Sequence, residues 1–275
     1  MTSMIVPHCS DESQPAAIMK RRRVLIFVEA AFAVALSVCN ARAQNAAPPA
    51  CKLTSIGEAT VTAVRDGGTL MLGDGRELKL AGIEVAGGSH ETLQVLAGGQ
   101  TLRLETLGPE QDRYGRLVAF AFPGDSRQSL QAALLAQGRA RVSARIGGKP
   151  CAEALLTIER AARAERRGLW ADPNFAPLQA ENLTRLQGEQ GRFALIEGKV
   201  LSVRESGATI YVNFGRRWTQ ALTVIILKRQ QRTFASAGVE PKQLEGRRIR
   251  VRGWIEQRGG PTVMAEAPEQ IELID

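Results

Sequence analysis

Histidine is scarce in this sequence of 275 residues, which contains only His8 and His90. Zinc clusters and conventional catalytic triads both depend on histidine side chains. Of the two, only His90 lies outside the N-terminal segment that we expect to be removed. With this single histidine, we expect neither a zinc cluster nor a conventional Ser-His-Asp triad.

Long hydrophobic runs are also missing. The mostly apolar run at 24–38 has 15 residues and contains Glu29, whereas a membrane-spanning helix needs about 20 residues. A basic cluster at 20–23 precedes the run and Ala41-Arg42-Ala43 follows it, which is the layout of a secretory signal peptide. We expect a signal peptide at 1–43, with translation from Met1 or Met19, and a periplasmic or secreted protein without a membrane span after cleavage. An uncleaved N-terminal membrane anchor is the alternative.

Cysteine is rare, with four in the whole sequence. Cleavage removes Cys9 and Cys39 and leaves Cys51 and Cys151. Two thiols in an oxidising compartment favour one disulfide, which would close a loop of about 100 residues and contribute about 4.7 kcal/mol in the chain-entropy model. Two separate buried thiols are the alternative.

The sequence contains both basic and acidic residues, with a modest excess of basic ones. The formal net charge is +8, and +6 remains beyond residue 43. A modest positive excess favours polyanionic partners. With 44% hydrophobic and 23% charged residues, the composition argues against wholesale disorder and against an integral membrane protein.

The chain is long enough for two domains. After an Ala/Pro-rich linker at 44–55, short apolar segments alternate with Gly-containing turns. These patterns predict five strands and three helices, which fit an OB-type five-stranded barrel with helices over 56–170. The strands are expected at 59–64, 69–72, 77–83, 101–106 and 117–122, and the helices at 91–97, 129–137 and 151–167.

A second domain is expected at 192–275, after a polar linker at 171–191 that contains Pro173 and Pro177. Its pattern predicts a small OB-like β-barrel with one helix at 228–237. The strand-like segments are 193–203, 209–214, 221–227, 247–255, 262–265 and 270–273.

Four sequence patterns in the first domain carry a family resemblance. They are DGGT at 66–69, KLAGIEV at 79–85, DRYGR at 112–116 and the segment from Cys151 to Trp170. Together they resemble the thermonuclease (staphylococcal nuclease-like) family. This resemblance implies an OB-type barrel in which carboxylates hold calcium beside a phosphodiester, a glutamate activates water, and two arginines stabilise the charged transition state.

The metal positions implied by the resemblance are only partly filled. Asp66 remains, but Gly68 stands where the family has an aspartate. Glu84 replaces the second aspartate and is one methylene longer, and Val85 replaces the threonine that follows. The remnant metal site therefore consists of Asp66 and Glu84, which is poor for an ion that prefers six to eight oxygens.

The catalytic positions are depleted as well. Lys79 replaces the first arginine and loses its bidentate geometry, Gly87 replaces the water-activating glutamate, and only Arg116 matches outright. His90 or Glu91 would have to move into the base position to restore activity; otherwise both are ordinary residues of a loop and a helix start. Arg116 is either a phosphate contact or part of a structural turn.

The second domain contains a strand in which Arg248, Arg250 and Arg252 alternate with smaller residues. Near it in the predicted barrel we expect the aromatic residues Tyr211, Phe214, Trp218 and Trp254. Arginines interleaved with aromatics suit single-stranded nucleic acid, so we take the three arginines with Tyr211 and Trp254 as a candidate binding surface. The alternative is a solvated strand face with aromatics in the core. The domain also resembles a companion module of degenerate bacterial thermonuclease-like proteins.

These observations favour an exported, catalytically impaired protein that binds nucleic acid or an envelope protein, without a cofactor. A working calcium-dependent phosphodiesterase that uses a displaced acid such as Glu84 or Glu91 is one alternative. A purely structural envelope module is the other.

Overall fold

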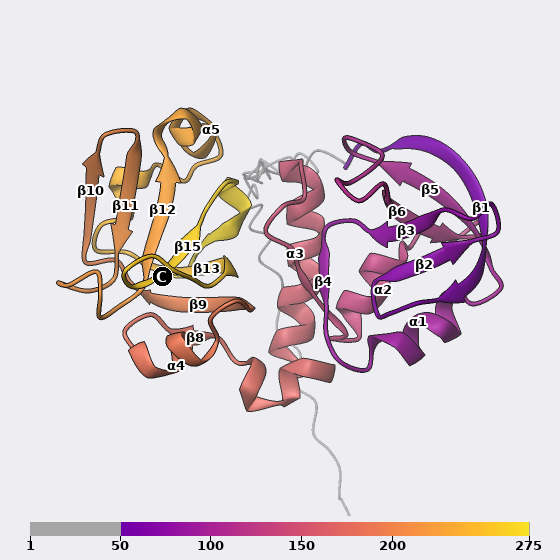
Figure 1. The fold of residues 1–275 in the computed structure, drawn as a ribbon, viewed down its shortest axis with the longest axis horizontal. Helices are drawn as coiled ribbons and strands as arrows, with labels where there is room; N and C mark the ends of the chain where they lie inside the picture. Colours follow the sequence, from indigo (N-terminus) through magenta and orange to yellow (C-terminus); the bar gives the residue numbers. More distant parts are fainter. Residues whose placement is uncertain (1–50, 275) are drawn as a thin grey trace, which may run out of the picture. The chain divides into compact units, whose positions relative to one another are not determined.

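The structure is a computed structural model that describes residues 51–274 (Figure 1). The predicted signal peptide, and the linker up to residue 50, lie outside the described residues. Within the described part of the chain, no helix has the length and apolarity needed to cross a lipid bilayer.

The first domain is a closed five-stranded barrel with the strand order β1-β2-β3-β6-β5, as predicted. Strand β1 is the longest and pairs with β2 through one part and with β5 through the other; two register shifts accompany its bend around the barrel (Figure 1). Inward-facing leucines of the other strands fill the barrel. The strands are β1 Thr54–Val64, β2 Thr69–Leu72, β3 Glu77–Leu80, β5 Thr101–Thr106 and β6 Leu117–Pro123.

Three helices accompany the barrel: α1 Ser89–Ala97, α2 Leu130–Ala136 and α3 Lys149–Ala164. The segment predicted as one strand at 77–83 is interrupted by a turn at 81–82. Beyond the turn, β4 Ile83–Val85 leaves the barrel and pairs with β7 Ala140–Val142. This separate ribbon carries Glu84 toward the second domain.

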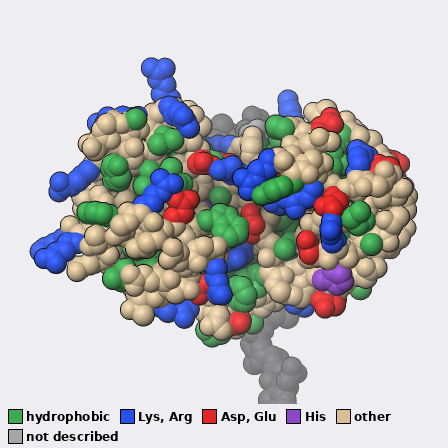
Figure 2. Space-filling model, in the orientation of Figure 1, with side chains coloured by type: hydrophobic (Ala, Val, Ile, Leu, Met, Phe, Trp, Pro, Cys, Tyr) green, Lys and Arg blue, Asp and Glu red, His purple; other side chains and the backbone are tan. Residues whose placement is uncertain are grey.

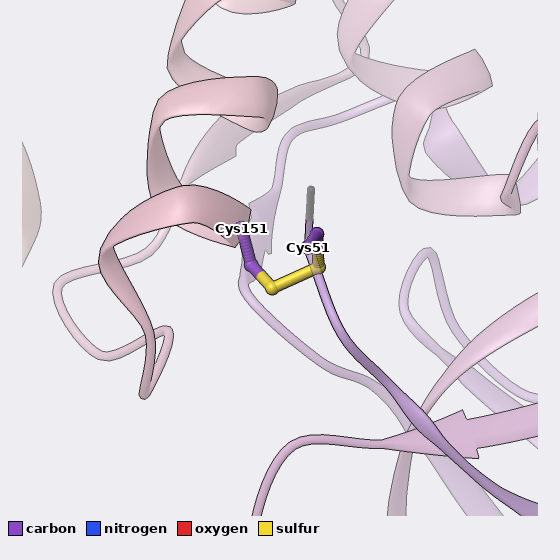
Figure 3. Close-up of a disulfide and its surroundings, with 2 residues drawn as sticks. All are labelled: Cys51 and Cys151. Atoms are coloured by element: carbon purple, nitrogen blue, oxygen red, sulfur yellow. A yellow bond between two sulfur atoms is a disulfide. The ribbon is translucent and has the colours of Figure 1, made fainter. Parts of the chain in front are cut away.

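A disulfide joins Cys51 to Cys151 (Figure 3). Cys51 precedes β1, and Cys151 lies in the first turn of α3, one hundred residues later. One apolar face of α3 is buried, with Leu155, Leu156 and Ala162 almost inaccessible. The disulfide and this face attach α3 to the barrel.

The segment at 171–191 was predicted as a linker, but it is folded. It contains the short 3₁₀ helix η2 Pro173–Phe175, β8 Leu178–Gln179 and α4 Leu183–Gly188, after η1 Gly168–Ala171. Strand β8 pairs in parallel with β9, and Leu178 and Leu186 are buried in the core of the second domain. The prolines and polar residues that suggested a linker are mostly on its exposed side.

The second domain consists of two sheets, where we predicted a small OB-like β-barrel. One has the order β16-β13-β9-β8 and the other β10-β11-β12-β15-β14, and apolar residues of both sheets share one core. The predicted helix at 228–237 is the 3₁₀ turn η3 Lys228–Gln230 followed by α5 Gln231–Ser236. The remaining elements are β9 Phe193–Lys199, β10 Ser202–Ser206, β11 Thr209–Asn213, β12 Thr223–Leu227, η4 Pro241–Leu244, β13 Arg248–Trp254, β14 Glu256–Gln257, β15 Pro261–Met264, η5 Pro268–Gln270 and β16 Ile271–Leu273.

Candidate functional site

Asp66 lies in the turn between β1 and β2. Its Oδ1 accepts the backbone N–H of Gly68 at 2.8 Å, and the Thr69 carbonyl accepts the N–H of Arg65 at 3.0 Å. This is an aspartate that closes its own turn, a common use of the residue. One carboxylate oxygen is therefore bonded to the backbone, and the side chain is exposed to solvent.

The two glycines at family carboxylate positions have different surroundings. A Cβ built on Gly68 would lie 3.1 Å from Cγ1 of Val85, so the turn packs tightly on β4. A Cβ on Gly87 would have no atom within 4 Å and is sterically free. A side chain at 68 would thus need Val85 to move, whereas one at 87 would need no rearrangement.

Glu84 is half-buried on β4 and opposes Arg141 of β7. The hydroxyl of Ser143 donates to Glu84 Oε1 at 3.0 Å. Arg141 in turn donates to the carbonyl of Phe193 at 2.8 Å, and burial lowers the pKa of this guanidinium. Glu84 and Arg141 line a cavity of about 390 Å³. Glu84 therefore lies next to the Ser143 hydroxyl, the Arg141 side chain and residues of the second domain.

Lys79 lies in β3, and Arg116 directly precedes the neighbouring strand β6, but the two side chains are held differently. Lys79 is half-buried in β3, opposite Thr69 and Val118 in the register. Arg116 is bonded to Asp112 Oδ2 through Nε at 2.9 Å and through a terminal nitrogen at 2.8 Å.

Asp112 holds the whole DRYGR turn. Its Oδ1 accepts the backbone N–H groups of Tyr114 and Arg116, and the Arg116 guanidinium lies 5.3 Å from the Tyr114 ring centroid. Partial burial raises the pKa of Asp112, but hydrogen bonds from Arg116 and the backbone outweigh it, and the pKa lies below its usual value. We predicted that Arg116 either contacts phosphate or is part of a structural turn, and these contacts place it in a structural turn.

Calcium does not fit the residues present. Within residues 51–274 there is no cluster of three or more His, Cys, Asp or Glu side chains able to hold a metal ion. The two remnant carboxylates are bonded elsewhere, Asp66 to its own turn and Glu84 to Ser143. His90 and Glu91 are exposed in the first turn of α1, and they add no third ligand.

The three arginines of β13 do not form the nucleic-acid surface that we predicted. Arg252 is completely buried, with its terminal nitrogens 3.0 and 3.1 Å from the carboxylate of Glu159 on α3. Arg250 is largely buried and pairs with Glu197 at 2.6 Å. The prediction is wrong for these two residues because their face of the sheet packs on α3, while Ile249 and Val251 fill the core on the other face.

The remaining members of that predicted surface are separated from one another. Arg248 is exposed at the start of β13. Trp254 is half-exposed and makes an edge-to-face contact with Phe193, with ring centroids 6.1 Å apart. Tyr211 lies on the other sheet, in a groove that Arg204, Arg216, Trp218 and Arg258 also line. Sequence reasoning missed this groove because we predicted one strand at 193–203, whereas β9 and β10 belong to different sheets. The Ser206-Gly207 pair marks the hairpin turn between β10 and β11.

Comparison with known protein families identifies a match to part of the chain. Residues 88–172 match the family model described as staphylococcal nuclease homologue. The match runs from α1 to the end of η1 and includes Arg116, whereas Asp66, Lys79 and Glu84 precede it. No curated protein matches the chain.

Proposed function

From the premise that the barrel domain is staphylococcal nuclease-like, we propose that this chain is an exported protein that binds nucleic acid and does not hydrolyse it. The observation that carries the proposal is the state of the two remnant carboxylates. Asp66 and Glu84 are bonded to the protein itself, and glycines occupy two further positions where the family resemblance implies acids.

The chemistry of phosphodiester cleavage explains why this matters. A hard cation such as calcium takes six to eight oxygen ligands, and loss of a positioned general base typically costs about 10²-fold to 10⁴-fold in rate. Lys79 can still attract a phosphate but lacks the fork of donors that arginine presents. A domain that keeps its fold and loses these groups retains the capacity to bind a polyanion.

Two further observations support the rest of the proposal. The chain beyond residue 43 keeps a charge of +6, which favours polyanionic partners such as nucleic acid. The disulfide between Cys51 and Cys151 suits an oxidising compartment, in agreement with the expected signal peptide.

A cleavage assay tests the loss of activity. The purified protein is incubated with single-stranded and duplex DNA and with RNA, in calcium and in chelator, and we expect no chelator-sensitive cleavage. Gly68→Asp combined with Val85→Thr and Gly87→Glu returns the two missing acids and the threonine, and Gly188→Glu, at another open glycine, is the matched control. Cleavage by the unaltered protein that needs calcium and disappears in Arg116→Ala would overturn the proposal.

A binding assay on the same protein tests the proposed binding of nucleic acid. We expect a labelled oligonucleotide to bind at low salt and to dissociate as salt is added, because phosphate contacts release counterions. Absence of binding at low salt would contradict the proposal and favour an envelope protein as partner or a structural role.

A further inference from the structure

The five-stranded sheet of the second domain has a groove of about 1070 Å³ on the face opposite its core. The register places Arg204, Tyr211 and Ile225 side by side across β10, β11 and β12. The next row along these strands contains Ser202, Asn213, Thr223 and, on β15, Thr262. Side chains from four strands thus converge on one concave surface.

The floor of the groove is polar and internally bonded. Asn213 donates to the Ser202 hydroxyl at 3.4 Å and accepts from Thr223 at 3.2 Å, and Thr262 donates to the carbonyl of Glu256 at 3.3 Å. These groups are satisfied by one another. A ligand would therefore be held by the groups of the walls more than by the floor.

The walls are predominantly cationic. Arg204, Arg216 and Arg258 line the groove, and lysine and arginine side chains project from the surface over β10 to β12 (Figure 2). The lining carboxylate, Glu205, is neutralised by Lys228 at 2.9 Å and Lys242 at 3.2 Å. Within residues 51–274, no ion pair engages Arg204 or Arg216, and Arg258 keeps one contact, to Glu256 at 2.8 Å.

Two aromatic rings complete the groove. Tyr211 is half-buried beside Arg204. Trp218 is 56% exposed, yet its ring lies directly on Gly259, where an added Cβ would come within 2.2 Å of a ring atom. The Trp218 ring thus packs on the Gly259 backbone and keeps more than half of its surface available to a stacked base.

We propose that this groove binds single-stranded nucleic acid, with bases stacked on Trp218 and Tyr211 and phosphates at Arg204, Arg216 and Arg258. Aromatic faces accept bases only when the bases are unpaired, and cations along the same groove follow the backbone. A duplex offers its phosphates but not its base faces, so the rings distinguish the two forms. The inference rests on the proposed function and names the surface and the form of nucleic acid.

The experiment measures binding of the full chain to a labelled oligo-dT by fluorescence anisotropy over a series of salt concentrations. Arg204→Ala and Arg216→Ala each remove one phosphate contact, so the slope of log affinity against log salt should fall by about 0.7 per variant. Trp218→Ala should weaken binding about tenfold and leave the slope nearly unchanged, because stacking is not a counterion effect. Arg232→Ala removes an exposed arginine of α5 that does not line the groove and should bind like the unaltered protein.

The outcomes separate this inference from the proposed function. If the unaltered protein binds oligo-dT and the groove variants match Arg232→Ala, the groove assignment is overturned and the proposed function stands. If the unaltered protein does not bind, both fail. Equal affinity for a duplex of the same length, or equal displacement by polyglutamate, would overturn the single-strand assignment.

Discussion

Arg252 has a structural role in this protein and is not part of a binding surface. Its terminal nitrogens contact Glu159, Glu272 and the carbonyl of Val142. Burial disfavours the charged form, but the two carboxylates outweigh it and raise the pKa of Arg252. The residue is a charged link between α3, β7, β13 and β16 and is not available to solvent.

We expect Arg252→Ala to lower the free energy of unfolding by about 3 to 5 kcal/mol, because it leaves Glu159 buried without its main partner. Urea denaturation followed by circular dichroism measures this loss. Arg232→Ala, at an exposed position, should change stability by no more than about 0.5 kcal/mol. Equal stability of the two variants would contradict a buried role for Arg252.

At the scale of elements, α3 connects the two halves of the described chain. Its first turn is joined to the segment before β1 by the disulfide, its apolar face packs on the barrel, and Glu159 near its end binds β13 of the second domain. The helix therefore contributes to the stability of both sheet systems.

The double variant Cys51→Ser with Cys151→Ser should lose several kcal/mol of stability, with about 4.7 kcal/mol as the chain-entropy value for a loop of this size. Thermal unfolding with and without reductant measures the effect. The unaltered protein in reductant should unfold like the double variant, and the variant should not respond to reductant. A reductant-insensitive unaltered protein would show that the bond does not contribute.

At the scale of the whole molecule, the two domains meet through buried charges in addition to apolar contacts. The carboxylate of Glu272 on β16 lies 2.5 Å from the guanidinium of Arg252 on β13 and 3.1 Å from that of Arg160 on α3. Burial opposes ionisation of this carboxyl, but Arg252 and Arg250 outweigh it and lower the pKa of Glu272. The charged form is thus favoured by folding.

The sign of the pH dependence follows. A carboxyl whose folded pKa is below its unfolded value of 4.5 contributes stability above that value and loses it as pH falls toward the folded pKa. We expect the unaltered protein to lose stability below about pH 4.5 more steeply than Glu272→Gln, by up to about 1.4 kcal/mol per pH unit. Urea unfolding of both proteins over a pH series measures the difference, and parallel curves would rule out this contribution.

Local sequence located the five barrel strands and the three helices of the first domain, because periodicity and Gly-rich turns depend on each segment's own backbone. It missed the turn that separates β3 from β4, and it missed β7. The DRYGR segment was singled out by the family resemblance, which left Arg116 either as a phosphate contact or as part of a structural turn. What only the tertiary structure decided is which side of a strand meets solvent. Arg250 and Arg252 alternate as an exposed face would, yet Arg252 is buried against Glu159 of α3 and Arg250 pairs with Glu197 of β9. Arg204, Tyr211 and Trp218 lie together only because of strand pairing and the loop that follows β11. The burial and the contacts of a side chain depend on elements distant in the chain, so the pattern of a single segment cannot predict them.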